Sequence, residues 1–228
     1  MTVEMWRKSE TIQASLQHLA FLPQLKGDKF ATVIAIHGRG PDESDLVPVV
    51  SALELPDLLL ITPRAPFAFP FGGFVWYNIA EESVPDPETF QISLGLLRKF
   101  IEEVREGYPV DPKRMLLLGF SQGTVMAYAA GLPDHSRLRG IAALSGYVPH
   151  RSAVPLQLSD LAGFPVFISH GHADPIIPVH LGREAAQLLM KAGADVNYHE
   201  YPMGHEVTGE VIADLSEWTR MRLASSAV

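Results

Sequence analysis

The feature that most constrains the fold is a series of short apolar runs, each followed by a turn and a longer helical pattern. The runs are continuously apolar rather than alternating, which is typical of parallel strands covered on both faces. Strands are expected at 30–38, 58–63, 115–120, 140–146, 164–171 and 196–201. Helices are expected near 43–53, 88–106, 122–131, 179–193 and 206–223. This alternation predicts an α/β fold with a mostly parallel, doubly wound sheet flanked by helices.

Three segments around this core complete the predicted fold. The helix near residue 88 is expected to start at Asp86-Pro87, and the stretch 10–23 is expected to pair as an antiparallel edge strand. The connection 147–163 is short and contains proline, so no large cap domain is expected and the site should be open and shallow. Apolar positions of the helix are Ile92, Leu96, Leu97, Phe100, Ile101 and Val104.

The composition fits one domain that spans residues 1–228. The net charge is −8 and no run of Lys or Arg occurs, which argues against a nucleic-acid partner. The absence of cysteine excludes disulfides and thiol catalysis. No stretch reaches the roughly 18 apolar residues of a membrane span, and the charged segment 1–13 lacks the apolar core of a signal peptide. We therefore expect a soluble, cytoplasmic protein.

The segment Gly119-Phe120-Ser121-Gln122-Gly123 has the pattern G-x-S-x-G, between an expected strand and an expected helix. A strand that turns directly into a helix crowds the residues two before and two after the serine. Glycine at both positions removes the Cβ atoms that would clash, so the serine can occupy a strained, exposed position. We interpret Ser121 as a candidate nucleophile. The alternative is an ordinary tight turn.

A serine hydroxyl needs a base that takes its proton and a third group that orients the base. His205 follows the strand expected at 196–201, and Asp174 follows the strand expected at 164–171, so both lie on loops at the edge where Ser121 is expected. The order Ser121, Asp174, His205 is the order of an α/β-hydrolase triad. Two other carboxylates that we considered as the acid are Asp195 and Asp214.

The alternation His170-x-His172-x-Asp174 also suggests metal ligands on an extended segment. Asp174 has a better use as the triad acid, and both histidines flank glycine at a strand end. We therefore expect no metal site and give the two histidines a structural role around the acid loop.

The segment 35–46 can supply a site for a negatively charged oxygen. The chain leaves a strand at His37, turns through glycines and enters an acidic helix start. The backbone N–H groups of Arg39 and of Gln122, at the start of the helix after the serine, are the expected oxyanion donors. His37 is expected to brace this loop, whereas Asp42 and Asp45 are expected to pin the loop and the helix start.

Residues 67–77 concentrate aromatic side chains in a segment interrupted by proline and glycine. Aromatic side chains on a loop are unfavourable when exposed to water, so we expect these to pack against another surface. Three alternatives are a wall of an acyl- or aryl-binding pocket, a homodimer contact, and packing over the sheet edge. Plain packing is the main alternative; as a functional role we favour the pocket wall, with Trp76, Phe74 and Tyr77 as substrate-binding residues, since ester pockets are mostly apolar.

Taken together, these motifs resemble the phospholipase/carboxylesterase family of α/β-hydrolases, which includes the acyl-protein thioesterases. The matching stretches lie within about residues 30–220 and are HGRGPDESDL, GFSQG, HGHADPIIPV and YPMGHEV, with FVWYN similar to a Trp-centred segment of the family. The resemblance implies the α/β-hydrolase fold and a Ser121, Asp174 and His205 triad. It also implies the Arg39 and Gln122 amides as oxyanion hole, and hydrolysis of carboxylic esters or thioesters without a cofactor.

Arg39 departs from the family, in which many members carry a small apolar residue at this position. A cationic side chain beside the pocket favours a substrate with a carboxylate or phosphate. The alternative is a solvent-facing side chain paired with Asp42 or Glu43.

We expect a serine carboxylesterase that hydrolyses small or medium carboxylic esters through an acyl-enzyme intermediate. The alternative within the same chemistry is an acyl-protein thioesterase or lysophospholipase that acts on longer acyl chains. The alternative of another class is a non-catalytic hydrolase-fold module that binds a ligand, which normally requires an incomplete triad. The expected partner is a small-molecule ester or thioester, with no cofactor and no metal.

Overall fold

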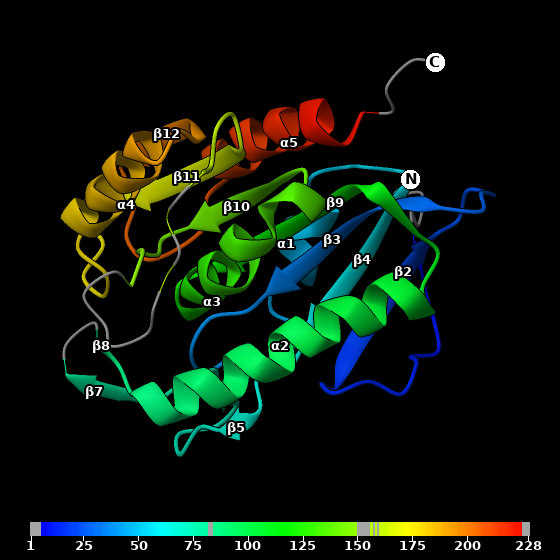
Figure 1. Cartoon of the computed structure of the whole chain (residues 1–228), viewed down its shortest axis with the longest axis horizontal. Coiled ribbons are helices and arrows are strands. Elements are labelled where there is room, and N and C mark those ends of the chain that lie inside the picture. The colour runs from blue at the N-terminus through cyan, green and yellow to red at the C-terminus, as the bar shows by residue number, and fades with distance from the viewer. Residues whose placement is uncertain (1–5, 82–83, 150–155, 157, 159, 225–228) are drawn as a thin grey trace.

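The chain forms an eight-stranded sheet with helices on both faces (Figure 1). The computed structural model describes residues 6–81, 84–149, 156, 158 and 160–224. The sheet order is β1-β2-β4-β3-β9-β10-β11-β12. These strands are β1 (Trp6–Lys8), β2 (His18–Pro23), β3 (Phe30–Ile36), β4 (Leu58–Pro63), β9 (Val110–Phe120), β10 (Gly140–Leu144), β11 (Pro165–Gly171) and β12 (Asp195–Tyr201). All pairings from β4 to β12 are parallel, whereas β1 and β2 are antiparallel at one edge.

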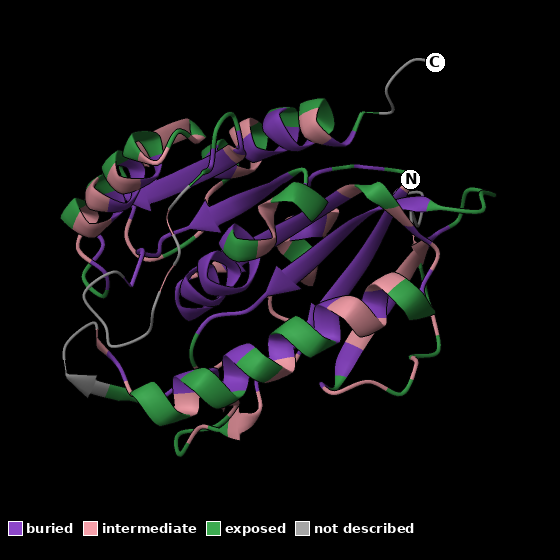
Figure 2. Cartoon of the chain, viewed as in Figure 1, coloured by how far each residue is buried: buried purple, intermediate pink, exposed green. Residues whose placement is uncertain are grey.

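Two hydrophobic cores cover the two faces of the sheet. Alternate residues of the central strands point to opposite sides, so Val33 packs in one core and Ile34 in the other. One core contains α2 (Pro87–Gly107), α3 (Gln122–Gly131) and α4 (Val179–Lys191); the other contains α1 (Val47–Ser51) and α5 (Gly209–Leu223). The strands β3, β4 and β10 and the helix α3 are buried throughout, whereas α2 and α4 expose one side (Figure 2). This arrangement confirms the predicted doubly wound α/β sheet.

The predicted elements agree with the structure except at their ends. β9 starts five residues before the expected strand, and α1 is only a short helix within the expected 43–53. The Asp86 side chain caps α2 by accepting a hydrogen bond from the Thr89 amide at 2.9 Å, as the Asp-Pro start predicts. Ile92, expected on the buried face of α2, is 45% exposed. Four short strands in two hairpins were not predicted: β5 (Phe67–Ala68), β6 (Phe74–Val75), β7 (Ile79–Glu81) and β8 (Val84–Pro85).

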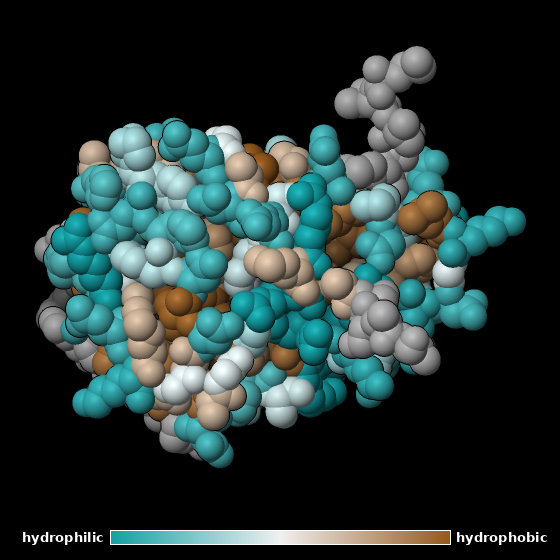
Figure 3. All heavy atoms as spheres, turned by 90° about the horizontal axis from the view of Figure 1, so that it is seen from above, coloured by the Kyte–Doolittle hydropathy of each residue, from teal (hydrophilic) through white to brown (hydrophobic). Residues whose placement is uncertain are grey.

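The outer surface is mostly hydrophilic where the molecule is seen from above (Figure 3). Within the described part of the chain, no helix combines the length and apolar character that a membrane span needs. The expectation of a short connection over 147–163 falls in part on residues 150–155, 157 and 159, which lie outside the described residues.

The carboxyl ends of the parallel strands meet at one edge of the sheet. Phe120 at the end of β9 is paired with Leu144 of β10, and Gly171 at the end of β11 is paired with Tyr201 of β12. The loops that follow these strands therefore emerge side by side. This edge carries Ser121 and the acid and base candidates, in agreement with the rule that sites in open α/β sheets lie at the carboxyl ends of strands.

Candidate active site

Ser121 lies on the sharp turn between β9 and α3. Its backbone has φ 56° and ψ −119°, a positive φ that is uncommon outside glycine. The Ser121 amide donates a hydrogen bond to the Leu144 carbonyl of the neighbouring strand at 2.9 Å, which fixes the turn to the sheet. The residue is 7% exposed, so Ser121 is buried.

The two glycines of the turn are required by close backbone contacts. A Cβ on Gly119 would overlap the carbonyl oxygen of Gly123, and a Cβ on Gly123 would overlap the carbonyl oxygen of Ile36 in β3. Both hypothetical contacts are well inside the 3.0 Å below which Cβ atoms are essentially never found. The structure therefore confirms the steric reason predicted for the two glycines of the G-x-S-x-G pattern.

Asp174 and His205 form a hydrogen-bonded pair at the same edge of the sheet. His205 Nδ1–H donates to Asp174 Oδ2 at 2.7 Å, and the Asp174 side chain has no exposed surface. The other carboxylate oxygen, Oδ1, accepts from the amides of Ile176 at 2.9 Å and Ile177 at 2.8 Å. The acid is thus held by its own loop and presents its remaining oxygen to the imidazole, which leaves Nε2 of His205 available on the other side.

The His205 ring lies against the residue that precedes the serine. Its centroid is 4.9 Å from the Phe120 ring, so the imidazole reaches the β9–α3 turn. Across the described residues, no hydrogen bond joins the Ser121 hydroxyl to His205. Such catalytic hydrogen bonds often shorten only when substrate is bound.

His170 supports the acid loop, as the sequence predicts. Its Nε2 donates to the Ile177 carbonyl at 2.7 Å and lies 3.5 Å from Asp174 Oδ2. A Cβ on Gly182 of α4 would be 2.5 Å from His170 Nδ1, so the helix packs directly on the ring. The predicted structural role of His170 is therefore specific: it joins the acid loop to α4.

The residues considered as metal ligands or as other acids of the triad bind other partners. His172 pairs with Glu200 at 2.8 Å rather than with His170, and no group of three or more His, Asp or Glu in the described part of the chain is placed to hold a metal ion. Asp195 pairs with Arg222 at 2.9 Å, and Asp214 accepts from the Tyr201 hydroxyl at 2.6 Å. Neither of these two carboxylates contacts His205 in the described structure.

The loop after β3 approaches the serine, and the amide of Arg39 in this loop is free. A Cβ on Gly38 would lie 3.4 Å from the Ser121 Cβ. The Arg39 amide and the Gln122 amide, at the first position of α3, have no acceptor among the hydrogen bonds of the described residues. Free amides at a helix start are suited to an anionic oxygen.

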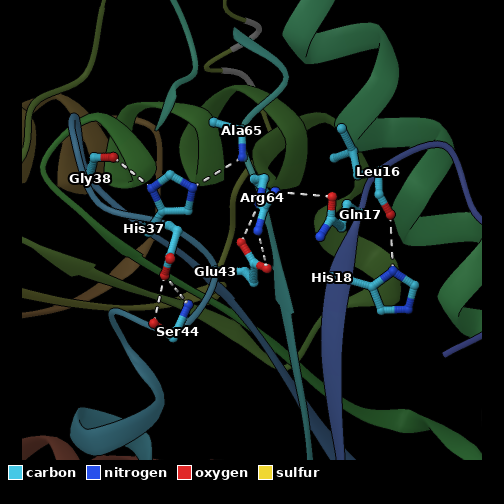
Figure 4. Close-up of polar contacts among 10 residues, drawn as sticks. Leu16, Gln17, His18, His37, Gly38, Glu43, Ser44, Arg64 and Ala65 are labelled. Carbon is cyan, nitrogen blue, oxygen red and sulfur yellow. Dashed lines mark hydrogen bonds and ion pairs between the residues drawn. The ribbon is translucent and has the colours of Figure 1, made fainter. Parts of the chain in front are cut away.

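His37 braces this loop, as its position predicts (Figure 4). The Ala65 amide donates to His37 Nε2 at 3.0 Å, which requires the proton to be on Nδ1, and Nδ1–H donates to the Gly38 carbonyl at 2.7 Å. Both ring nitrogens are occupied, so His37 is not available as a base. Glu43, in the same loop, accepts hydrogen bonds from Nε and Nη2 of Arg64 at 2.5 and 2.7 Å.

The side chain of Gln122 joins the serine turn to the aromatic segment. Its Oε1 accepts from the Trp76 amide at 3.1 Å and its Nε2 donates to the Tyr77 carbonyl at 2.8 Å. The sequence predicted a role only for the backbone of Gln122. A buried glutamine beside the candidate nucleophile is the signal that could have indicated this second role.

The aromatic residues expected to bind substrate are placed differently from one another. Trp76 is 0% exposed and Tyr77 is 1% exposed, whereas Phe74 is partly buried under the Arg64 guanidinium, 4.3 Å from its ring centre. The Trp76 Nε1–H donates to the His37 carbonyl at 2.9 Å. Trp76 therefore packs behind the loop of Arg39, an arrangement that favours the packing alternative for this residue over a pocket wall.

Replacing Trp76 by Phe is expected to destabilise the protein by about 1–3 kcal/mol, because the His37 carbonyl loses its buried donor. Activity on acetate and on long-chain esters should fall by the same factor, since the ring does not reach the surface. Thermal unfolding and kcat/KM for two acyl lengths measure both effects. A selective loss on long chains with an unchanged Tm would instead assign Trp76 to substrate binding.

The free energy of unfolding is expected to decrease as the pH falls below about 6.5. Burial lowers the pKa of His18, His37 and His170, so the unfolded chain binds protons that the folded chain does not. Each histidine can contribute up to about 1.4 kcal/mol per pH unit between its folded and unfolded pKa, and this stability is fully present above the unfolded pKa. Urea unfolding between about pH 7.5 and pH 5.5 measures the slope.

The variant His18→Gln provides the control for this slope. It removes one of the three buried imidazoles, so the slope of the free energy of unfolding against pH should decrease by the contribution of one histidine. Equal stability at both ends of the pH range in the unsubstituted protein would contradict the expectation.

Comparisons with known proteins agree with this fold. A family model described as Phospholipase/Carboxylesterase matches residues 22–223. Acyl-protein thioesterase 1 of Yarrowia lipolytica is 31% identical, covering 82% of this chain and 90% of that protein. The acyl-protein thioesterase 1 of Debaryomyces hansenii, also 31% identical, matches 63% of this chain and 66% of its own length. A carboxylesterase of Bacillus cereus has a similar crystal structure, with a TM-score of 0.78, 26% identity and coverage of 91% of this chain and 94% of that one.

The match extends from β2 to the last residue of α5 and includes every segment of the candidate site. The fold, the turn that carries Ser121 and the sequence relatives all lead to the same group of enzymes. The chain belongs to the phospholipase/carboxylesterase family and is a serine hydrolase of the α/β-hydrolase fold that acts as an esterase or thioesterase.

Proposed function

We propose that the protein hydrolyses small or medium carboxylic esters through an acyl-enzyme intermediate at Ser121. The observation that carries the proposal is the 2.7 Å hydrogen bond between His205 Nδ1 and Asp174 Oδ2 beside the strained serine turn. A buried carboxylate that orients an imidazole next to such a serine is the arrangement that activates a hydroxyl nucleophile.

In the proposed reaction, the Ser121 oxygen attacks the carbonyl carbon of the ester while His205 Nε2 takes the hydroxyl proton. The tetrahedral oxyanion is bound by the amides of Arg39 and Gln122. His205 then gives the proton to the leaving oxygen, the C–O bond breaks and the acyl group remains on Ser121. Water, deprotonated by the same imidazole, releases the acid and restores the serine. Asp174 holds the imidazole in the required tautomer throughout.

A thioesterase that acts on longer acyl chains is the second candidate. Relatives named acyl-protein thioesterase 1 favour this candidate. The match to the one from Yarrowia lipolytica covers 82% of this chain. The same serine, histidine and carboxylate would perform this reaction, with a thiol as leaving group. A cytoplasmic location and a homodimer remain predictions of the sequence.

The test combines covalent labelling with a series of substrates. A fluorophosphonate should modify the protein at Ser121, identified by mass spectrometry of the labelled peptide. Hydrolysis of p-nitrophenyl esters from acetate to palmitate, and of the matching thioesters, then gives the acyl and leaving-group preference. A label on another residue would refute the mechanism, whereas a maximum at long-chain thioesters would select the second candidate.

A further inference from the structure

Arg39 is a cationic side chain on the loop that supplies a proposed oxyanion donor. Its side chain is exposed, and its guanidinium carbon lies 4.7 Å from the centre of the Phe69 ring. Phe69 belongs to the hairpin of β5 and β6, whose Phe74 carbonyl accepts from the Gly40 amide at 2.8 Å. The hairpin is therefore fixed to the loop that approaches Ser121, and the Phe69 ring lies under the guanidinium of Arg39.

The carboxylates nearest in sequence to Arg39 are already bound elsewhere. Asp42 accepts from the amide and the hydroxyl of Ser44 at 2.8 and 2.6 Å, and Glu43 is bound by Arg64 (Figure 4). The alternative that Arg39 pairs with Asp42 or Glu43 is therefore not what the structure contains. Among the described residues, no ion pair or side-chain hydrogen bond involves the Arg39 guanidinium, so its N–H donors remain available.

The positive charge of Arg39 also acts on a buried side chain, that of Tyr77. Burial raises the pKa of the Tyr77 hydroxyl, as does Tyr147 at 3.5 Å, and the positive charge of Arg39 acts in the opposite direction. The Tyr77 carbonyl in turn receives the Gln122 side chain beside Ser121. The positive charge of Arg39 therefore reaches the Tyr77 side chain, and the backbone of the same residue contacts the Gln122 side chain next to Ser121.

We infer that Arg39 binds a carboxylate of the substrate, so that the enzyme prefers esters or thioesters that carry a carboxylate on the acyl or the leaving group. The planar guanidinium fork matches a carboxylate. A single uncompensated cation neutralises one negative charge, which suits a carboxylate better than a phosphate dianion in a chain of net charge −8. This inference rests on the proposed esterase function.

The experiment compares matched charged and neutral substrates. For the acyl side, p-nitrophenyl monoesters of adipic acid are compared with those of its neutral amide, adipamic acid. For the leaving group, 4-carboxyphenyl butyrate is compared with 4-carbamoylphenyl butyrate. In at least one pair, kcat/KM of the wild type should be about five- to tenfold higher for the acid, the scale of a partly exposed charge pair. The preference should decrease with added salt.

Two substitutions at Arg39 and one elsewhere complete the test. Arg39→Gln should bring the acid-to-amide ratio close to one, and Arg39→Lys should retain part of it. Lys191→Gln removes the same charge from the exposed end of α4 and should leave the ratio unchanged. Because each ratio compares two substrates on one variant, altered oxyanion binding at position 39 cancels.

The outcomes separate the inference from the function on which it rests. A ratio near one in both pairs, or a ratio that Arg39→Gln does not change, overturns the role of Arg39. The serine mechanism is then still supported by hydrolysis of the neutral esters. If no ester is hydrolysed and no fluorophosphonate label is found, the proposed function and the inference both fail.

Discussion

Replacing Ser121 by Ala is expected to reduce kcat for ester hydrolysis by about 10⁴- to 10⁶-fold, the range for loss of a triad nucleophile. The variant retains the His205–Asp174 hydrogen bond and the free amides, but it has no oxygen that can form the acyl-enzyme. Turnover of p-nitrophenyl butyrate, measured with the purified variant and the wild type side by side, gives the ratio directly.

The fold should be unaffected by this substitution. Ala at position 121 adopts the same positive φ of 56° with a side chain no larger than that of serine. An unchanged Tm together with the lost turnover and lost fluorophosphonate labelling would therefore assign the effect to chemistry. If the variant hydrolyses the ester as fast as the wild type, Ser121 is only a turn residue and the mechanism is wrong.

Replacing Gly123 by Ala is expected to lower the free energy of unfolding by more than about 3 kcal/mol, at the upper end for added volume in a packed interior. The new Cβ would overlap the carbonyl oxygen of Ile36 and lie 2.6 Å from that of His37. Both oxygens belong to backbone at the end of β3, so α3 must move away from the strand. For a chain of this length the Tm should fall by roughly 6–12 °C.

Gly95→Ala is the matched control, because it makes the same chemical change in a different environment. Gly95 lies within α2, and a Cβ there would have no heavy atom within 4 Å. Alanine also has the higher helix propensity, so this variant should be more stable by up to about 1 kcal/mol. Differential scanning calorimetry measures both variants, and equal stability of Gly123→Ala and the wild type would contradict the steric account of the turn.

Much of the site could be predicted because its information is local in the sequence. The apolar runs that become β3, β9 and β11 lie next to the loops that carry the chemical groups, so the edge of the sheet was predictable without knowledge of the packing. The glycines on both sides of Ser121 encode a steric requirement within five residues. The order of Ser121, Asp174 and His205 then indicated which loops had to meet.

What the sequence could not predict depends on contacts between distant segments. Trp76 belongs to a run of aromatic residues that is consistent with a pocket wall, yet its indole donates to the His37 carbonyl 39 residues away. The same limit applies to His170, whose fit against Gly182 follows from how α4 packs on the sheet. Whether a side chain lines a site or supports it is set by packing.

The sequence by itself determined the strand and helix order, the steric design of the serine turn and the residues available as base and acid, because periodicity and backbone crowding act between neighbours along the chain. Only the tertiary structure decided that Asp174 gives one oxygen to its own loop and the other to His205, and that Arg39 rests on Phe69 rather than pairing with Glu43. These choices are competitions among partners brought together by folding, and the partner with the better geometry is fixed only when the sheet and its loops are assembled.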